Sequence, residues 1–139
     1  MNDLFSIEGK VALVTGGSRG IGLMIARGFV EAGAKTYISS RKADVCDAVA
    51  AELSKSGTCI SLPADLGSEA GARGLADAIG AREPKLDILV NNAGATWGAP
   101  LAEYPDDAFD KVMNLNVKGI FHLTRFLTPL LAKAASDES

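Results

Sequence analysis

Short apolar runs alternate with amphipathic stretches along most of the chain. Four runs have the length and composition of buried strands: Val11–Thr15, Lys35–Ser40, Cys59–Ala64 and Leu86–Asn91. Between and after them apolar residues recur at helical spacing, which predicts helices over Gly20–Ala32, Ala43–Lys55, Ser68–Ile79 and about Asp106–Lys133. This regular alternation predicts an α/β fold, a parallel sheet with right-handed crossovers and helices on both faces.

Local residues refine these boundaries. Ser68 is a candidate N-cap, and Pro63 places the end of the third strand near an edge or a turn. Pro129 lies within the last predicted helix and is expected to kink it, and the polar tail from Ala134 is expected to be irregular.

Composition and charge describe an ordinary globular chain. Its 139 residues predict one domain over residues 1–139, and the net charge of −3, without a Lys/Arg cluster, argues against nucleic acid and membrane surfaces. No apolar run reaches the ~18 residues of a membrane span, and the start of the chain lacks the pattern of a signal peptide. Cys46 and Cys59 form no CxxC pair and are expected to be free, buried thiols. We therefore expect a cytoplasmic protein.

A glycine-rich loop, TGGSRGIG (Thr15–Gly22), follows the first strand and opens the first helix. Glycines in this setting allow a tight turn, close approach of backbone N–H groups to a pyrophosphate and close helix packing. The N-terminus of the helix adds positive potential for phosphates. The setting favours a dinucleotide site over a turn that binds nothing.

The second strand ends with Ser40 and Arg41 and carries no carboxylate there. An acidic residue at this place binds the ribose 2′-OH of NAD, whereas an arginine accommodates the 2′-phosphate of NADP. Arg19 lies in the loop across the same crevice. Either arginine alone is compatible with a solvated surface residue, but the two together favour NADP(H).

Two further stretches follow strand ends. Asp65 is a candidate acceptor for the adenine amino group or, with equal weight, a helix N-cap. The turn Asn91–Gly94 lies where ligands bind in such sheets, and its alternative is a plain turn.

Together, TGxxxGxG, Asp65, NNAG and the asparagine of LNVKGIF (Asn116) resemble the short-chain dehydrogenase/reductase family. The resemblance runs from Gly9 to about Leu131. From NNAGATWGAPL through NLNVKGIF the chain is most similar to NADPH-dependent 3-oxoacyl reductases, including those of the rhamnolipid pathway.

The resemblance implies roles for individual residues. Asn116 would be the asparagine of the catalytic tetrad, whose backbone carbonyl holds a water of the proton relay. Its own setting, a polar residue in an apolar helix, is more typical of a structural hydrogen bond. Asn91, Ala93 and Gly94 would line the adenosine ribose and stabilise the sheet. The implied cofactor-binding residues are Gly16, Ser18, Arg19, Gly20, Ile21, Gly22, Ser40, Arg41, Asp65, Leu66, Asn92, Ala93 and Gly94.

The resemblance also implies a Rossmann-type sheet with strand order 3-2-1-4, truncated before the fifth strand. The family's serine and YxxxK pair lie beyond that point, and Tyr37 and Tyr104 are followed four residues later by Arg41 and Ala108. The strand Leu86–Asn91 would then be an edge strand without a neighbour, and such a strand can pair with another chain. The predicted helix over Asp106–Lys133 matches a helix that packs against its twin in dimers of the family. A homo-oligomer, dimer or tetramer, is therefore expected.

The predicted function is that of the cofactor part of an NADP(H)-dependent oxidoreductase acting on a small carbonyl or alcohol, with 3-oxoacyl reduction favoured. Alternatives are a sugar, steroid or other alcohol dehydrogenase of the same family, or a non-catalytic NADP(H)-binding module if the chain ends at Ser139. His122 is expected to be structural rather than a metal ligand. Trp97 and Tyr104 would wall a substrate pocket or cover the core.

Overall fold

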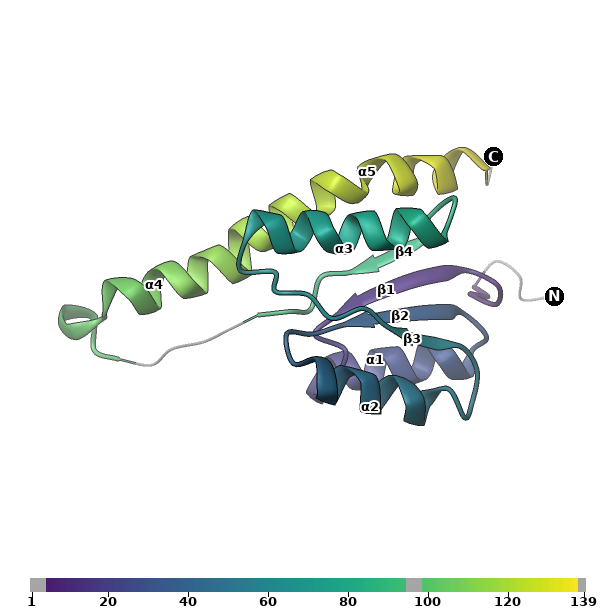
Figure 1. Cartoon of the computed structure of the whole chain (residues 1–139), viewed down its shortest axis with the longest axis horizontal. Coiled ribbons are helices and arrows are strands. Elements are labelled where there is room, and N and C mark those ends of the chain that lie inside the picture. The colour runs from purple at the N-terminus through teal and green to yellow at the C-terminus, as the bar shows by residue number, and fades with distance from the viewer. Residues whose placement is uncertain (1–4, 95–98, 138–139) are drawn as a thin grey trace.

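The computed structural model describes residues 5–94 and 99–137 and contains one parallel sheet between two layers of helices. The strands are β1 (Val11–Thr15), β2 (Lys35–Ser39), β3 (Cys59–Ser61) and β4 (Ile88–Val90), in the order β3-β2-β1-β4. Helices α1 (Gly20–Glu31) and α2 (Ala43–Leu53) cover one face, and α3 (Glu69–Arg82) and α5 (Gly119–Asp137) the other (Figure 1). The predicted fold class and strand order are confirmed.

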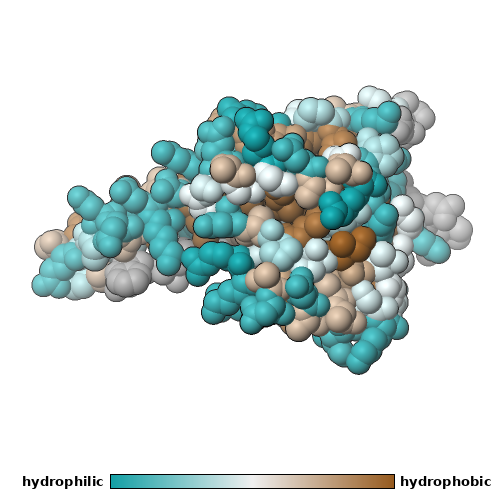
Figure 2. All heavy atoms as spheres, in the orientation of Figure 1, coloured by the Kyte–Doolittle hydropathy of each residue, from teal (hydrophilic) through white to brown (hydrophobic). Residues whose placement is uncertain are grey.

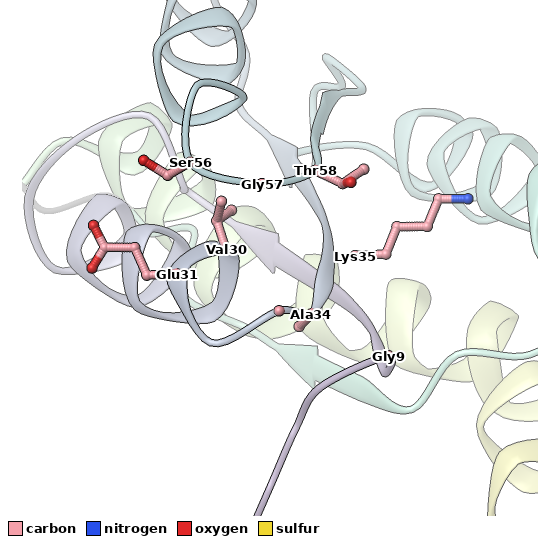
Figure 3. A pocket seen from close by; sticks show the side chains of 9 residues that line it. Gly9, Val30, Glu31, Ala34, Lys35, Ser56, Gly57 and Thr58 are labelled. Atoms are coloured by element: carbon pink, nitrogen blue, oxygen red, sulfur yellow. The ribbon is translucent and has the colours of Figure 1, made fainter.

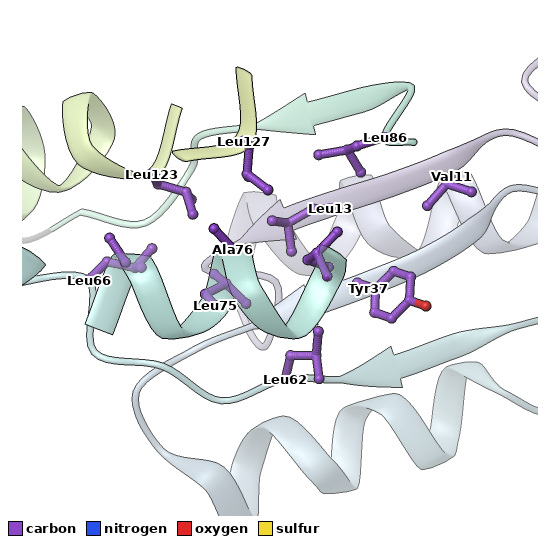
Figure 4. Close-up of a cluster of buried hydrophobic side chains, with 12 residues drawn as sticks. Val11, Leu13, Tyr37, Leu62, Leu66, Leu75, Ala76, Leu86, Leu123 and Leu127 are labelled. Atoms are coloured by element: carbon purple, nitrogen blue, oxygen red, sulfur yellow. The ribbon is translucent and has the colours of Figure 1, made fainter. Parts of the chain in front are cut away.

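Alternating side chains of the central strands supply both cores. Leu13 and its register partner Tyr37 belong to the cluster under α3 and α5 (Figure 4). Val14 and its partner Ile38 belong to the cluster under α1 and α2. Since both faces are covered, every residue of β1 is buried, which explains its continuous apolar run from Val11 to Val14.

The outer strands are shorter than their apolar runs predict. Beyond β3, Leu62 N donates to Ile38 O at 2.9 Å and Ala64 N to Ser40 O at 3.1 Å. Because Leu62 N and Ala64 N both face β2, the nitrogen of Pro63 faces the free edge of the sheet, where a missing N–H leaves no ladder bond unmade. The chain thus still follows β2 beyond the last residue of β3. Beyond β4, Asn92 N donates to the Thr15 hydroxyl at 3.0 Å, and the chain leaves the sheet there.

The single helix predicted over Asp106–Lys133 consists of three segments. α4 (Asp106–Met113) is followed by a π-helical turn, η2 (Asn114–Lys118), in which Gly119 N donates to Asn114 O, and then by α5. A short 3₁₀ turn, η1 (Leu101–Glu103), precedes α4, which extends away from the sheet (Figure 1). α5 continues past Pro129 to Asp137, so the predicted irregular tail from Ala134 is wrong.

A buried carboxylate ties the end of α3 to β2. Glu83 is 7% exposed, and its Oε2 accepts a short hydrogen bond from the Tyr37 hydroxyl and pairs with Lys35 Nζ. Burial, followed by the bond to Glu83, raises the pKa of Tyr37 above its ordinary value of 10.0. The hydrogen bond to Glu83 raises the pKa of Lys35 above 10.5.

The pH dependence of stability follows from these two directions. A group whose pKa is raised by folding stabilises the folded state below its unfolded pKa and loses that contribution as pH rises through the folded value. We expect the free energy of unfolding to fall above about pH 10, the ordinary tyrosine pKa.

Tyr37→Phe removes one donor from the buried Glu83 carboxylate. We expect the free energy of unfolding at neutral pH to fall by about 1–3 kcal/mol, and its decline above pH 10 to become shallower. Urea unfolding followed by circular dichroism between pH 7 and 11 measures both effects. An unchanged alkaline decline in the variant would contradict the assignment to Tyr37.

Candidate functional site

The predicted site residues gather at the carboxyl edge of the sheet. All four strands are parallel, so the segments that follow them, residues 16–19, 40–42, 64–67 and 91–94, meet at the same edge. The segment after β1 leads to α1 on one face of the sheet. β4 lies beside β1, on the side away from β2, and is followed by the Asn91–Gly94 turn. Ligands of open α/β sheets bind at such a switch point.

The glycine loop packs backbone against backbone. Gly16 and Gly20 have φ values of 66° and 58°, in the left-handed region that favours glycine. A Cβ on Gly22 would lie 2.0 Å from Gly16 O, and one on Gly17 would lie 2.8 Å from a methyl carbon of Ile38. α1 therefore begins directly against the loop. Its N-cap, Arg19, makes no capping side-chain bond, which leaves the first-turn N–H groups available to an anion.

Thr15 joins this loop to the turn after β4. Its hydroxyl donates to Val90 O at 3.3 Å and accepts from Asn92 N and Ala93 N, both at 3.0 Å. Asn92 Nδ2 in turn donates to Gly16 O at 3.3 Å. Thr15 is the first residue of the predicted glycine-rich loop, but its role in joining β1 to the turn after β4 was not predicted, although a hydroxyl that ends an otherwise apolar buried strand is a usable signal.

Asn91 is oriented differently from its neighbour. Its Nδ2 donates to Thr124 Oγ1 of α5 at 3.3 Å. The side chain thus holds the end of β4 against α5. This agrees with the expected stabilisation of the sheet.

The end of β2 offers unpaired polar groups. The Ser39 and Ser40 hydroxyls are buried, and each has no hydrogen-bond partner within the described part of the chain. Arg19 and Arg41 are exposed, and neither forms an ion pair with another described residue. A buried hydroxyl costs free energy unless it finds a partner, and guanidinium groups bind phosphate oxygens. These residues therefore fit a phosphorylated ribose.

Asp65 and Leu66 form the segment after β3. Asp65 is exposed, and its Oδ1 accepts from Gly67 N at 2.9 Å. The N-cap of α3 is Ser68, whose Oγ accepts from Gly71 N at 3.1 Å. The N-cap alternative for Asp65 is therefore wrong, and its second carboxylate oxygen is available to a ligand. The Leu66 side chain is buried.

Asn116 lies in η2, in the π-helical turn. A Cβ built on Gly94 would be 3.2 Å from Asn116 Oδ1, so the structure brings Asn116 against the turn after β4. π-helical turns often occur at functional sites because they redirect side chains that a regular helix would place elsewhere.

Other predicted features lie apart from this edge. Trp97 is outside the described residues, and Tyr104 follows η1. His122 stacks on Phe126 with ring centroids 6.3 Å apart, and no group of three or more potential metal ligands occurs among the residues described. No helix in that same part of the chain is long and apolar enough to cross a membrane.

A depression of about 580 Å³ lies at the amino ends of the strands, lined in part by Gly9, Lys35 and Thr58 (Figure 3), away from the candidate site.

The strand order and the glycine loop at the carboxyl edge define a dinucleotide-binding protein of the Rossmann type. A family model described as short chain dehydrogenase matches residues 10–137. The chain belongs to the short-chain dehydrogenase family.

Several known proteins are similar to this chain. The rhamnolipids biosynthesis 3-oxoacyl-[acyl-carrier-protein] reductase of Pseudomonas aeruginosa is 54% identical over 139 residues, which is all of this chain and 54% of the relative. The 2-dehydro-3-deoxy-D-gluconate 5-dehydrogenase of Pseudoalteromonas atlantica is 42% identical, over 90% of this chain and 50% of the relative. A solved structure described as the Pseudomonas aeruginosa RhlG/NADP active-site complex superposes with a TM-score of 0.91 at 54% identity, over 96% of this chain and 52% of that one. The chain spans about half the length of the curated relatives it matches.

Thr15→Val removes the hydroxyl but keeps the shape of the side chain. Ala93 N loses its acceptor, and Asn92 N keeps only its bond to Val90 O, so we expect the free energy of unfolding to fall by about 1–3 kcal/mol. Thr15→Ser keeps the hydroxyl and should lose less. Urea unfolding of both variants measures the difference. A Thr15→Val variant as stable as the original chain, with a larger loss in Thr15→Ser, would show that packing of the methyl group rather than hydrogen bonding accounts for Thr15.

Proposed function

We propose that residues 1–139 are the cofactor-binding part of a single Rossmann domain in an NADP(H)-dependent oxidoreductase. The reaction would transfer a hydride between nicotinamide and a carbonyl or secondary alcohol. The observation that carries the cofactor choice is the end of β2. There the buried Ser40 hydroxyl and the Arg41 side chain have no partner among the described residues, and the sequence has no carboxylate. The description of RhlG as an NADP complex supports the same choice.

The chain offers one set of groups to each part of such a cofactor. The 2′-phosphate would bind Ser40, Arg41 and Arg19. The pyrophosphate would bind the loop from Gly16 through Ser18 to Gly22 and the first turn of α1, where Ile21 is 70% exposed. Adenine would contact the Asp65 carboxylate and the Leu66 backbone. The nicotinamide half would extend past Asn92–Gly94 toward Asn116.

When bound, NADP(H) supplies or accepts the hydride. The residues described here bind and orient it, because parallel strands and helix N-termini place N–H donors and basic side chains at one edge. The 139 residues contain no YxxxK pair, so the general acid of the reaction is not among them. Asn116 is proposed to hold a water of the proton relay through its backbone carbonyl.

We propose a 3-oxoacyl compound as the substrate class. Support comes from the 54% identity to a 3-oxoacyl reductase, compared with 42% to the gluconate dehydrogenase. A fold alone does not select a substrate. A sugar, steroid or other alcohol therefore remains the alternative.

Arg41→Ala tests the cofactor assignment. Loss of a charge-assisted phosphate contact should weaken NADPH binding by about 1.5–3 kcal/mol, roughly ten- to a hundredfold in Kd, and change NADH binding little. Arg27→Ala, at an exposed arginine of α1, is the matched control and should change neither. Fluorescence titration with both cofactors gives the result. Equal affinities of the original chain for NADPH and NADH would refute the choice of NADP(H).

We further propose a homo-oligomer formed through α4 and α5. Phe109, Met113, Val117 and Phe121 are spaced four residues apart and are 54%, 39%, 52% and 58% exposed. They form a stripe about 18 Å long on one side of the extended helix. In contrast to this apolar stripe, the face of the projecting α4 arm that Figure 2 shows is mainly hydrophilic. A water-exposed apolar stripe of this length is typical of an interaction surface.

The stripe and its charges suit an antiparallel pairing of two copies. A twofold axis between Met113 and Val117 would place Phe109 against the partner's Phe121. The same axis brings the acidic first turn of α4, with Asp106 and Asp107, near the partner's Arg125.

We also propose a cytoplasmic location, in keeping with the two free, buried cysteines.

Phe121→Glu places a charge in this stripe. We expect the variant to sediment as a monomer at concentrations where the original chain is a dimer, because a charge at an apolar interface is not compensated. Val45→Glu, at a 39% exposed apolar residue of α2, is the control and should not alter the oligomer. A monomeric original chain would contradict the proposal.

A further inference from the structure

Two helices hold the segment after β3 between them without intervening side chains. A Cβ on Gly71 of α3 would lie 1.8 Å from Asp65 O, and one on Gly119 of α5 would lie 2.4 Å from Leu66 O. Both distances are shorter than any contact a side-chain carbon can make. Residues Asp65 and Leu66 are called here the strap. Their two carbonyl groups thus lie directly on helix backbones from two different parts of the chain.

This contact is specific to the strap and is not a general feature of glycines in these helices. Apart from the adjoining backbone of α3 itself, Gly74 has no atom of a described residue within 4 Å of its Cβ position, and Gly80 has only a methyl carbon of Leu130 at 3.9 Å. Packing of α3 and α5 on the sheet therefore does not itself require glycine. Only the two positions that face the strap exclude a side chain.

The strap also carries unused polar groups. Asp65 Oδ1 accepts from Gly67 N, and the Leu66 N–H makes no hydrogen bond to any other residue that the structure describes. A donor and a carboxylate acceptor on adjacent residues match the paired acceptor and donor on the edge of an adenine ring. Such a pair recognises a base only if the backbone that carries it is held in place.

We propose that Gly71 and Gly119 are positioning residues for the adenine end of the cofactor, an assignment that rests on the proposed function. They act through the strap and do not touch the ligand. A side chain at either position displaces the carbonyl beneath it and moves the Leu66 N–H and the Asp65 carboxylate with it.

Gly119 also connects the strap to the other end of the site. Its N–H donates to Asn114 O and closes the π-helical turn, and its Cβ position is 3.2 Å from that same oxygen. Asn116 lies within this turn, against Gly94. A shift of α5 at Gly119 therefore changes the position of Asn116 as well as that of the strap.

Gly119→Ala is the test, with Gly74→Ala as the matched helical control and 2′,5′-ADP as the ligand for the adenine end. We expect Gly119→Ala to weaken binding of 2′,5′-ADP about tenfold, because displacement of binding groups by a fraction of an ångström disrupts their alignment. Gly74→Ala should keep the original affinity. Calorimetric titration of the 139-residue chain and both variants gives the three values.

Amide hydrogen exchange without ligand supplies the second readout. Gly119→Ala should speed exchange or shift the resonances at Leu66, Gly67 and Asn116, whereas Gly74→Ala should leave them unchanged. Gly71→Ala, with the shorter contact, should affect the strap in the same way, and a variant that fails to fold while Gly74→Ala folds also supports an obligatory glycine.

The outcomes separate the two proposals. If the original chain does not bind 2′,5′-ADP, the proposed function fails, and the exchange data alone decide whether the glycines fix the strap. If the original chain binds and Gly119→Ala binds equally well with unchanged exchange at Leu66, the role assigned to Gly119 is overturned. If exchange changes but affinity does not, Gly119 is structural only, and the positioning role is overturned.

Discussion

Direct contact between backbones is the constraint on which this structure depends. At Gly22, Gly71 and Gly119 a helix meets the carbonyl group of a loop at a distance that leaves no room for a Cβ. The first contact closes the loop after β1, and the other two hold the strap after β3. Because backbone groups are fixed by the helices and the sheet, loops held this way have little freedom. The groups proposed to bind the cofactor are therefore already arranged in its absence, which would lower the entropic cost of binding.

Hydrogen bonds complete this arrangement at the centre of the sheet. The Thr15 hydroxyl joins β1 to β4 and to the turn that follows it, and Asn92 joins that turn to the glycine loop. The two sides of the crevice are thus connected through one buried hydroxyl, 1% exposed. By contrast, the buried Ser40 hydroxyl at the end of β2 finds no partner in the part of the chain that the structure describes, and a bound phosphate would supply one there. Polar groups with hydrogen-bond partners thus hold the segments of the candidate site together, and the Ser40 hydroxyl, which lacks one among the described residues, lies where the ligand is expected.

Much of the fold was predictable because each element carries its own signal. β1 is buried on both faces and is apolar from Val11 to Val14, and Ser68 caps α3 through a local hydrogen bond. The ends of β3 and β4 were predicted less well, because the apolar runs continue beyond the regular strands. After β4, Asn92 N bonds to the Thr15 hydroxyl, which a local pattern does not reveal. The π-helical turn around Asn116 could not be predicted, since its apolar spacing differs little from that of a regular helix. The orientation of Asn91 toward Thr124 depends on a residue 33 positions away.

The sequence by itself determined the order of strands and helices, the glycine loop and the basic residues that replace a carboxylate after β2. These are local properties, set by the period of apolar residues and by the chemistry of single side chains. Only the tertiary structure decided that Asp65 is not a helix cap, that Thr15 links two strands and that Gly71 and Gly119 exclude side chains from the strap. Each of these depends on a distance between segments far apart in the sequence. Such distances arise when helices pack on the sheet, and no local pattern records them.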